Sequence, residues 1–258
     1  MEKRPLYMDD SYLKEFDAVV MGVNDGKYVV LDNTGFYPNS GGQPWDEGEI
    51  VRESDGQEFK VIFVGKFGGK ISHEVDREGL KVNDKVHCKI DWDRRYKLMR
   101  SHTSAHIVSG VFSKEAKALI TGNQISLDKI RIDFNLENFD RERMEGFLEK
   151  ANEIVEKNLP VVVSYMSREE AMKEKEGSDL FKLAAVFPEN IKEIRIVAIG
   201  EQSSPEPSFA KSHKGIGVWD RQADGGTHVK STGEVGRIKL LKFDNKGAAN
   251  RRVYYEIE

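Results

Sequence analysis

The sequence predicts an α+β protein, with a β-rich first third followed by a mixed region of helices and strands. Three observations lead to this class. Six short strand patterns, separated by turns rich in Gly, Asn and Asp, precede Asp91. A helical pattern, with no Pro or Gly before Gly110, then runs from Asp93 to about Lys117. Beyond it, further helical patterns alternate with β-branched strand patterns, as in layered α+β folds.

The first third reads as a small closed or stacked β-structure. Strand patterns at 16–22 and 27–32 flank Asn24-Asp25-Gly26, a strong signal for a tight hairpin. Four more strand patterns follow at 47–53, 59–65, 70–76 and 85–91. Short strands spaced by roughly 8–12 residues indicate a small barrel or sandwich.

The remaining two thirds contain the predicted helices. After the helix at 93–117, a second one is expected from Asp140 to Asn158, with Asp140 as its N-cap. Ser167 and Glu170 form a capping box for a third, short helix that ends near Gly177. Strand patterns are expected at 161–166, 193–200, 215–220, 236–243 and 252–258. We place a boundary near residue 92, which gives two domains, 1–92 and 93–258.

Composition and charge exclude several classes of protein. Hydrophobic residues make up 38% of the 258 residues, enough for a folded core. The net charge of −4 argues against a globally basic nucleic-acid binder, although local basic clusters stay open. The sequence has no apolar run near the ~18–20 residues that span a bilayer and no secretory signal pattern. Its single cysteine, Cys88, excludes an intrachain disulfide. We therefore expect a cytoplasmic protein without a membrane partner, whose oligomeric state, monomer or homodimer, stays open.

His102 and His106 are the first candidate functional residues. They lie four positions apart in the predicted helix 93–117, so both imidazoles face the same side and can reach one ion. Two ordinary helix histidines would show the same spacing, and both interpretations stay open. The zincin pattern needs Glu directly after the first His, but Thr103 stands there, which argues against that class of metalloprotease.

A second tract, QADGGTHVKSTGEVG, supplies Asp224 and His228 around two glycines. A carboxylate and an imidazole at this spacing can both bind zinc. An Asp before two glycines also fits a turn residue that binds nearby backbone amides, and this alternative stays open.

A third tract, TGFYPNSGGQPWDEGEI, contains Gly41 and Gly42. Such a glycine pair indicates a loop that packs closely against a ligand or another segment. Its GGQ triplet is shared with peptide-chain release factors, but a match of three residues between strand patterns is too short to carry an assignment.

Taken in order, the three tracts resemble the editing domain of alanyl-tRNA synthetase and its free-standing relatives, the AlaX proteins. That family has a Gly-rich TxFYPxSGGQ segment, then an HxxxH helix, and much later a CGGTH segment. The corresponding stretches here are 34–43, 102–106 and 224–228, and the tail NKGAANRRV is also similar. The resemblance covers nearly the whole chain. It implies the free-standing form, with an N-terminal barrel similar to a translation-factor domain ahead of an editing domain of antiparallel sheet and packed helices.

The resemblance also implies a function, a cofactor and a set of site residues. The implied reaction is hydrolysis of mischarged tRNA-Ala, with Ser-tRNA-Ala and also Gly-tRNA-Ala as substrates. One Zn²⁺ per chain would be held by His102, His106, His228 and Asp224. Thr34 is expected to contact the seryl hydroxyl, because its own hydroxyl donates and accepts, although a locally satisfied strand residue is the alternative. The other expected contacts with the substrate or tRNA are Gln43, Gln124, Gly41, Gly42, Arg94, Arg95, Arg251 and Arg252.

One departure from the family pattern concerns the metal ligands. The family's cysteine in CGGTH is Asp224 here, so either the carboxylate replaces the thiolate or three histidines hold the ion with water in the fourth place. Three other functions stay open: editing of another aminoacyl-tRNA such as Ser-tRNA-Thr, hydrolysis of a small ester or amide, and RNA binding around a structural zinc. The TGFYPNSGGQP segment favours the alanyl branch, and a structural zinc would need more thiolates than Cys88 supplies.

Overall fold

The computed structural model describes residues 4–137, 140–170, 193–200, 218–247 and 250–258. The chain forms two compact units. The first comprises Met1–His102, Asn123–Ile130 and Gly226–His228, and the second comprises Thr103–Gly122, Arg131–Gly225 and Val229–Glu258. The predicted boundary after residue 92 stays a prediction.

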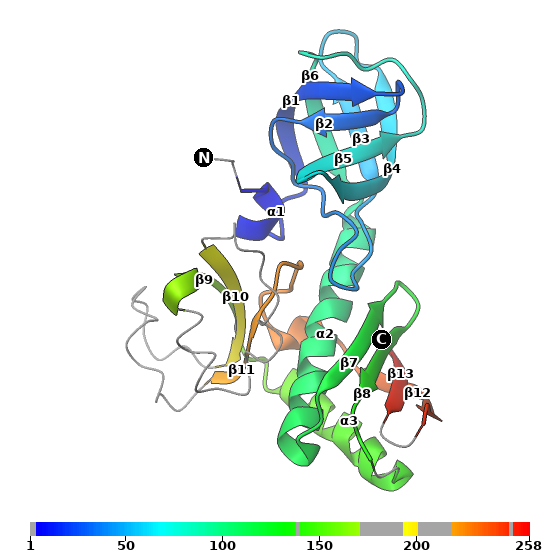
Figure 1. Cartoon of the computed structure of the whole chain (residues 1–258), viewed down its shortest axis with the longest axis vertical. Coiled ribbons are helices and arrows are strands. Elements are labelled where there is room, and N and C mark those ends of the chain that lie inside the picture. Colours follow the sequence, from blue (N-terminus) through cyan, green and yellow to red (C-terminus); the bar gives the residue numbers. More distant parts are fainter. Residues whose placement is uncertain (1–3, 138–139, 171–192, 201–217, 248–249) are drawn as a thin grey trace. The chain divides into compact units, whose positions relative to one another are not determined.

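Six strands of the first unit close into a barrel, which confirms the predicted β-rich first third (Figure 1). They are β1 (Glu15–Asn24), β2 (Tyr28–Leu31), β3 (Gly48–Arg52), β4 (Glu58–Phe67), β5 (Lys70–Val75) and β6 (Lys85–Ile90). Their order around the barrel is β1-β2-β5-β4-β3-β6, and every neighbouring pair is antiparallel. Residues that alternate along these strands, among them Val20, Val29, Ile50 and Val86, fill the interior. The likeness of this barrel to a translation-factor domain stays a prediction.

A short helix, α1 (Leu6–Asp9), precedes the barrel, and the long helix α2 (Trp92–Ala116) follows it. The sequence predicts α2 to within one residue at each end. It begins at Trp92 because the carboxylate of Asp91 accepts the backbone N–H of Arg94 at 3.1 Å and satisfies a free amide of the first turn.

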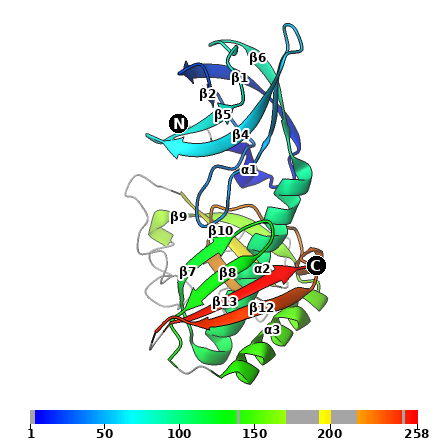
Figure 2. The same ribbon diagram turned by 90° about the vertical axis from the view of Figure 1, so that its right-hand side faces the viewer.

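The second unit combines sheets with helix α3 (Arg141–Glu156). Its N-cap, Asp140, accepts the amide of Arg143 as predicted. The apolar face of α3 is buried, and strand β12 (Ile238–Asn245) lies beside this helix (Figure 2). Asn152 exchanges two hydrogen bonds with the backbone of Ile238. Phe147 of α3 packs edge-on against Phe112 of α2, which stacks on Phe134 of strand β8 (Ile130–Phe134).

Two antiparallel sheets complete the fold. One has the order β11-β10-β9 and the other β12-β13-β8-β7. Their strands are β7 (Ile120–Ile125), β8 (Ile130–Phe134), β9 (Val161–Ser167), β10 (Glu193–Gly200), β11 (Val218–Ala223), β12 (Ile238–Asn245) and β13 (Arg251–Ile257), and a 3-10 turn, η2, covers Thr232–Glu234. The α+β class is therefore confirmed.

The sequence did not predict β7 and β8. Strand β7 reads ITGNQI, and its Gly, Asn and Gln are poor strand formers, so its pairing with β8 outweighs its local preference. The predicted capping box between Ser167 and Glu170 is present, with both reciprocal bonds formed. The rest of that predicted helix, from residue 171, lies outside the described residues, as do positions 215–217 of the strand predicted at 215–220. Within the described part of the chain, none of the helices has the length and apolar character to span a membrane.

Candidate metal centre

Helix α2 presents His102 and His106 on one side, one turn apart. Both side chains are buried, with residue exposures of 3% and 5%. Thr103, which stands between them in the sequence, is fully buried, and its hydroxyl accepts the amide of Val229 at 3.3 Å. That bond connects the tract that contains His228 to α2.

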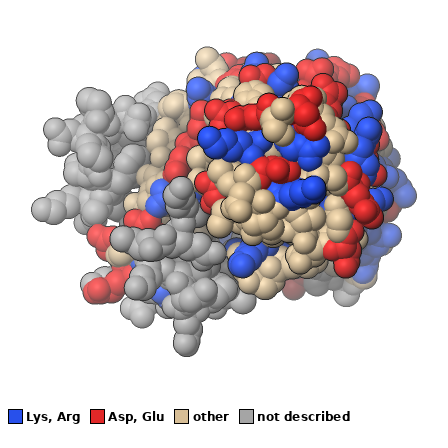
Figure 3. Space-filling view, turned by 90° about the horizontal axis from the view of Figure 1, so that it is seen from above, with Lys and Arg blue, Asp and Glu red and all other residues tan. Residues whose placement is uncertain are grey.

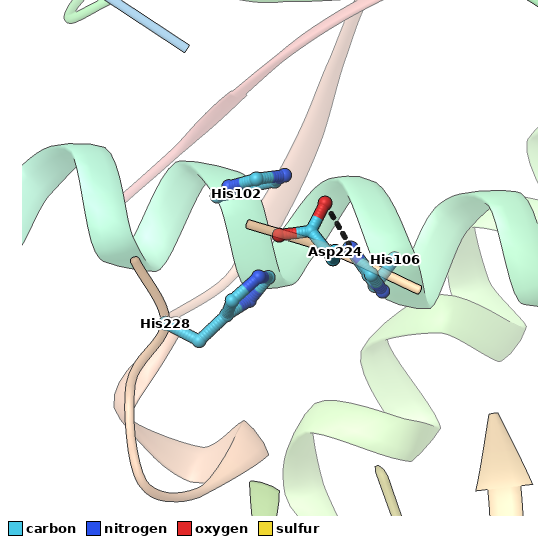
Figure 4. A group of neighbouring side chains, drawn as sticks. All are labelled: His102, His106, Asp224 and His228. Carbon is cyan, nitrogen blue, oxygen red and sulfur yellow. Dashed lines mark ion pairs between the residues drawn. The ribbon is translucent and has the colours of Figure 1, made fainter. Parts of the chain in front are cut away.

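Asp224 and His228 follow strand β11, on the tract that contains the two glycines. Together with His102 and His106 they form a cluster in which the candidate ligand atoms all lie within 4.8 Å of one another (Figure 4). The rings of His102 and His228 have centroids 4.4 Å apart, and His106 Nε2 lies 3.7 Å from Asp224 Oδ2. The two pairs that the sequence places four residues apart therefore converge on one point.

The outer nitrogen of each helix histidine has a partner. His102 Nδ1 lies 2.8 Å from Gln43 Oε1, and His106 Nδ1 lies 3.2 Å from Asp220 Oδ2. In each pair the imidazole N–H donates to the oxygen, so Nε2 is the nitrogen with which each ring would bind an ion. Metal-binding histidines are oriented in this way by an acceptor behind them.

The charges around His106 favour a cation. Burial lowers the pKa of this imidazole, but hydrogen bonds and charge from Asp220 and Asp224 outweigh burial and raise the pKa to about 9. A positive charge at this point is thus stabilised by two carboxylates. Three imidazoles and one carboxylate are a donor set that zinc accepts, and the residues present therefore fit a zinc ion.

Gln43 comes from the segment 35–46, here called the Gly-rich loop. At its tip, Ser40 and Gln43 exchange two backbone hydrogen bonds across Gly41 and Gly42, which adopt positive φ angles of 58° and 85°. A Cβ at Gly42 would lie 2.0 Å from the amide oxygen of Asn123, so this residue must be glycine for the close approach.

The side chain of Gln43 is fully buried and bridges two ligand-bearing segments. Besides accepting from His102, its amide donates to Thr227 Oγ1 at 2.8 Å, and its oxygen accepts the N–H of Thr227 at 3.2 Å. Thr227 directly precedes His228. Gln43 therefore contacts the candidate ligand His102 and the residue that precedes the candidate ligand His228.

Thr34 and Gln124, the other predicted pocket residues, differ in their surroundings. The hydroxyl of Thr34 lies 2.9 Å from His73 Nε2 inside the barrel and accepts the amide of Phe36 at 3.1 Å, which is the locally satisfied arrangement. Gln124 is exposed on β7. The substrate contacts assigned to these two residues stay predictions.

The four predicted tRNA-binding arginines make internal contacts. Arg95 and Arg251 are buried, at 0% and 4% exposure, and Arg251 binds backbone carbonyls that include that of Gly247. Arg252 forms a two-pronged pair with Asp133, and Arg94 donates to the carbonyl of Trp45. Figure 3 shows basic and acidic side chains interspersed on one face of the molecule. Binding of tRNA by these arginines stays a prediction, and burial argues against direct contact through Arg95.

Asp220 is the site residue that sequence reasoning missed. It lies on β11, is 3% exposed, and contacts His106. Its neighbour Trp219 lies over Gly110 of α2, where a Cβ would come within 2.6 Å of the indole ring. In the sequence, the one indication of a role for Asp220 is its position four residues before Asp224. Its contact with His106 depends on the packing of β11 against α2, where Trp219 lies over Gly110.

Comparisons of the sequence with known proteins identify the family of this chain. The family model "tRNA synthetases class II (A)" matches residues 10–94, and "Threonyl and Alanyl tRNA synthetase second additional domain" matches residues 194–254. The "Alanyl-tRNA editing protein AlaX-M" of Methanosarcina mazei is 49% identical over 98% of this chain and 95% of its own length. The protein of the same name from Saccharolobus solfataricus is 42% identical over 98% of both chains. The chain belongs to the AlaX-M family of alanyl-tRNA editing proteins.

Relatives beyond AlaX-M show the same region inside a longer protein. The "Alanine--tRNA ligase" of Pyrococcus furiosus is 38% identical over 94% of this chain, which corresponds to 24% of the ligase. The range matched by the first family model, 10–94, contains the Gly-rich loop. The range matched by the second, 194–254, contains the tract with Asp224 and His228. His102 and His106 lie between these two ranges, and the structure brings them together with Asp224 and His228 in the candidate metal cluster.

Proposed function

We propose that the protein is a metal-dependent aminoacyl-tRNA deacylase that removes serine, and also glycine, from tRNA-Ala in the cytoplasm. The observation that carries the proposal is the cluster of three histidines and one aspartate, in which Gln43 and Asp220 hold the outer nitrogens of two ligands. Membership of the AlaX-M family supplies the substrate class.

The chain's own residues prepare the site for an ester substrate. Gln43 holds His102 and the segment before His228, and Asp220 holds His106, so the ligands are oriented before anything binds. Asp224 keeps 21% of its side chain exposed, which leaves the cluster accessible on that side. When bound, zinc supplies a positive charge that can hold the aminoacyl amine or position the attacking water.

The need for such a reaction follows from the energetics of small pockets. One methyl group changes binding by only ~1–3 kcal/mol, so a pocket for alanine excludes glycine weakly, and it also rejects an added hydroxyl weakly. A second, hydrolytic site can be built to recognise the seryl hydroxyl, which alanine lacks. Thr34 and Gln124 remain our candidates for contacts with the substrate.

The test is deacylation of defined esters by the purified protein. Ser-tRNA-Ala, Gly-tRNA-Ala, Ala-tRNA-Ala and Ser-tRNA-Thr are incubated with the protein, with and without a zinc chelator, and ester loss is followed over time. We expect rapid loss of the seryl ester of tRNA-Ala, little loss of the alanyl ester, and inhibition by the chelator. Hydrolysis of Ser-tRNA-Thr alone would move the protein to the threonyl branch, and stability of all four esters would contradict the proposal.

A further inference from the structure

A fully buried ion pair fastens the end of the Gly-rich loop to helix α2. Arg95 on α2 and Asp46 on the loop have side-chain exposures of 0%. Arg95 Nε donates to both carboxylate oxygens, at 2.9 and 3.0 Å, and Nη2 donates to Oδ2 as well. Charges removed from water in this way are tolerated only when further hydrogen bonds complete the pair.

Those further bonds connect the pair to the other arm of the loop. Arg95 Nη2 donates to the carbonyl of Gly35 at 2.6 Å, and Nη1 donates to the carbonyl of Ser11 at 2.9 Å. Asp46 Oδ2 accepts the amide of Tyr37 at 2.6 Å, and the amide of Asp46 donates to the carbonyl of Tyr37 at 3.0 Å. The first and last residues of the loop therefore converge on one guanidinium group.

The tip of the same loop meets the same helix further along. Arg95 and His102 are seven residues apart, which is two helical turns, a rise of about 10 Å and nearly the same side of the helix. The base of the loop is held at Arg95, and Gln43 at its tip contacts His102 Nδ1 at 2.8 Å. The amide of Ile125 donates to the carbonyl of Gly42 at 2.8 Å, which supports the tip from β7.

We propose that Arg95 and Asp46 are positioning residues that fix the Gly-rich loop along α2, so that Gln43 orients the metal ligand His102. Their effect on catalysis rests on the proposed deacylase function, whereas their effect on the loop does not. This assigns Arg95 a role inside the protein in place of the predicted contact with tRNA. A fork of five donors suits the task, because lysine cannot bind a carboxylate and two carbonyls in the same plane.

The test compares Arg95→Lys with Asp46→Asn, an isosteric variant that keeps the volume of the pair. Arg52→Lys is the matched control, since Arg52 forms a similar fork with Asp55 at the barrel surface. Hydrogen exchange of the Gln43 and Ile125 amides is measured in the metal-free proteins. Zinc affinity by competition with a chelator, and kcat and KM for Ser-tRNA-Ala, are measured on the folded variants.

In both variants we expect faster exchange of these two amides and unchanged exchange in the β1–β6 ladder. Zinc binding should weaken by about 10–100-fold, the range for partners behind metal ligands. The value of kcat should fall while KM changes little. Adding Gln43→Ala to Arg95→Lys should cause little further loss of zinc affinity or kcat, because both changes remove the same support of His102.

Folded variants with normal loop exchange and normal zinc affinity would overturn the proposal, even if their melting temperatures were lower. Additive losses of zinc affinity from Arg95→Lys and Gln43→Ala would overturn the proposal that the Arg95–Asp46 pair acts on His102 through Gln43. Faster loop exchange and weaker zinc binding in the variants, together with a wild-type protein that cleaves none of the esters, would support the positioning role of Arg95 and Asp46 and reject the deacylase function.

Discussion

Two buried histidines of this chain, His73 in the barrel and His106 on α2, differ in charge because their neighbours differ: His73 is neutral and His106 is positively charged. Burial lowers the pKa of His73 to about 4, and its hydrogen-bond partners are the neutral carbonyl of Val29 and the hydroxyl of Thr34. Burial also lowers the pKa of His106, but two carboxylates more than reverse this and raise it to about 9. Burial alone therefore does not determine the charge of these two histidines, because the neighbouring groups decide it.

The largest expected effect comes from removing the charged member of this comparison. His106→Ala should lower deacylation of Ser-tRNA-Ala by more than about 100-fold, because a ligand should matter more than the partner behind it. The control is His87→Ala, which removes an exposed barrel histidine paired with Asp17. Equal activity of His106→Ala and His87→Ala would remove His106 from the chemistry.

The pH dependence of stability tests the neutral member. An imidazole with an ordinary pKa of 6.5 in the unfolded chain and about 4 in the folded protein stabilises the fold fully above pH 6.5. That contribution is lost as the pH falls toward 4, and it amounts to roughly 3 kcal/mol.

The measurement is urea unfolding of the metal-free protein at several values between pH 7 and pH 4.5. His73→Gln should unfold more easily than the wild type at pH 7 and should show a shallower loss of unfolding free energy as the pH falls. Parallel pH curves for the two proteins would contradict a neutral, buried His73.

Asp220→Asn tests the partner that makes the environment of His106 differ from that of His73. The substitution keeps the volume and an oxygen acceptor but removes the negative charge. Zinc affinity should fall by about 10-fold, the lower end of the range for such partners. A matched surface variant, Asp244→Asn, breaks an exposed pair with Lys242 and should leave zinc affinity unchanged. An unaltered dissociation constant for Asp220→Asn would show that its charge does not reach the site.

The smallest expected effect concerns two helix glycines. Gly110→Ala should lower the unfolding free energy by about 1–3 kcal/mol, because the new Cβ would lie 2.6 Å from the Trp219 ring. It should also weaken zinc binding, because a shift of Trp219 would move Asp220, the next residue on β11, away from His106. Gly146→Ala, on α3 with open space around it, should raise the unfolding free energy by about 0.5–1 kcal/mol. Equal changes in the two variants would show that Trp219 does not depend on Gly110.

Local patterns in the sequence predicted much of this molecule. Strand alternation and turn glycines predicted the six barrel strands, and Asp140 predicted the start of α3, because these signals act between residues close in the chain. The HxxxH spacing predicted that His102 and His106 share a helix side for the same reason.

The partners behind the ligands could not be predicted in this way. Gln43 and Thr227 are separated by 184 residues, and His106 and Asp220 by 114. Such contacts depend on how the Gly-rich loop and β11 pack on α2. Strand β7 was missed because Gly122 and Asn123 are poor strand formers, so its pairing with β8 outweighs its local preference. Strand β8, IRIDF, does alternate apolar and charged residues as strands do, and that signal was overlooked.

The most direct test is a zinc titration of the metal-free protein with deacylation of Ser-tRNA-Ala as the readout. We expect negligible activity before zinc is added, a linear rise as zinc is added, and a plateau at about one zinc ion per chain. Full activity in protein shown by elemental analysis to contain no metal would contradict the claim that the cluster of His102, His106, Asp224 and His228 acts through a bound ion.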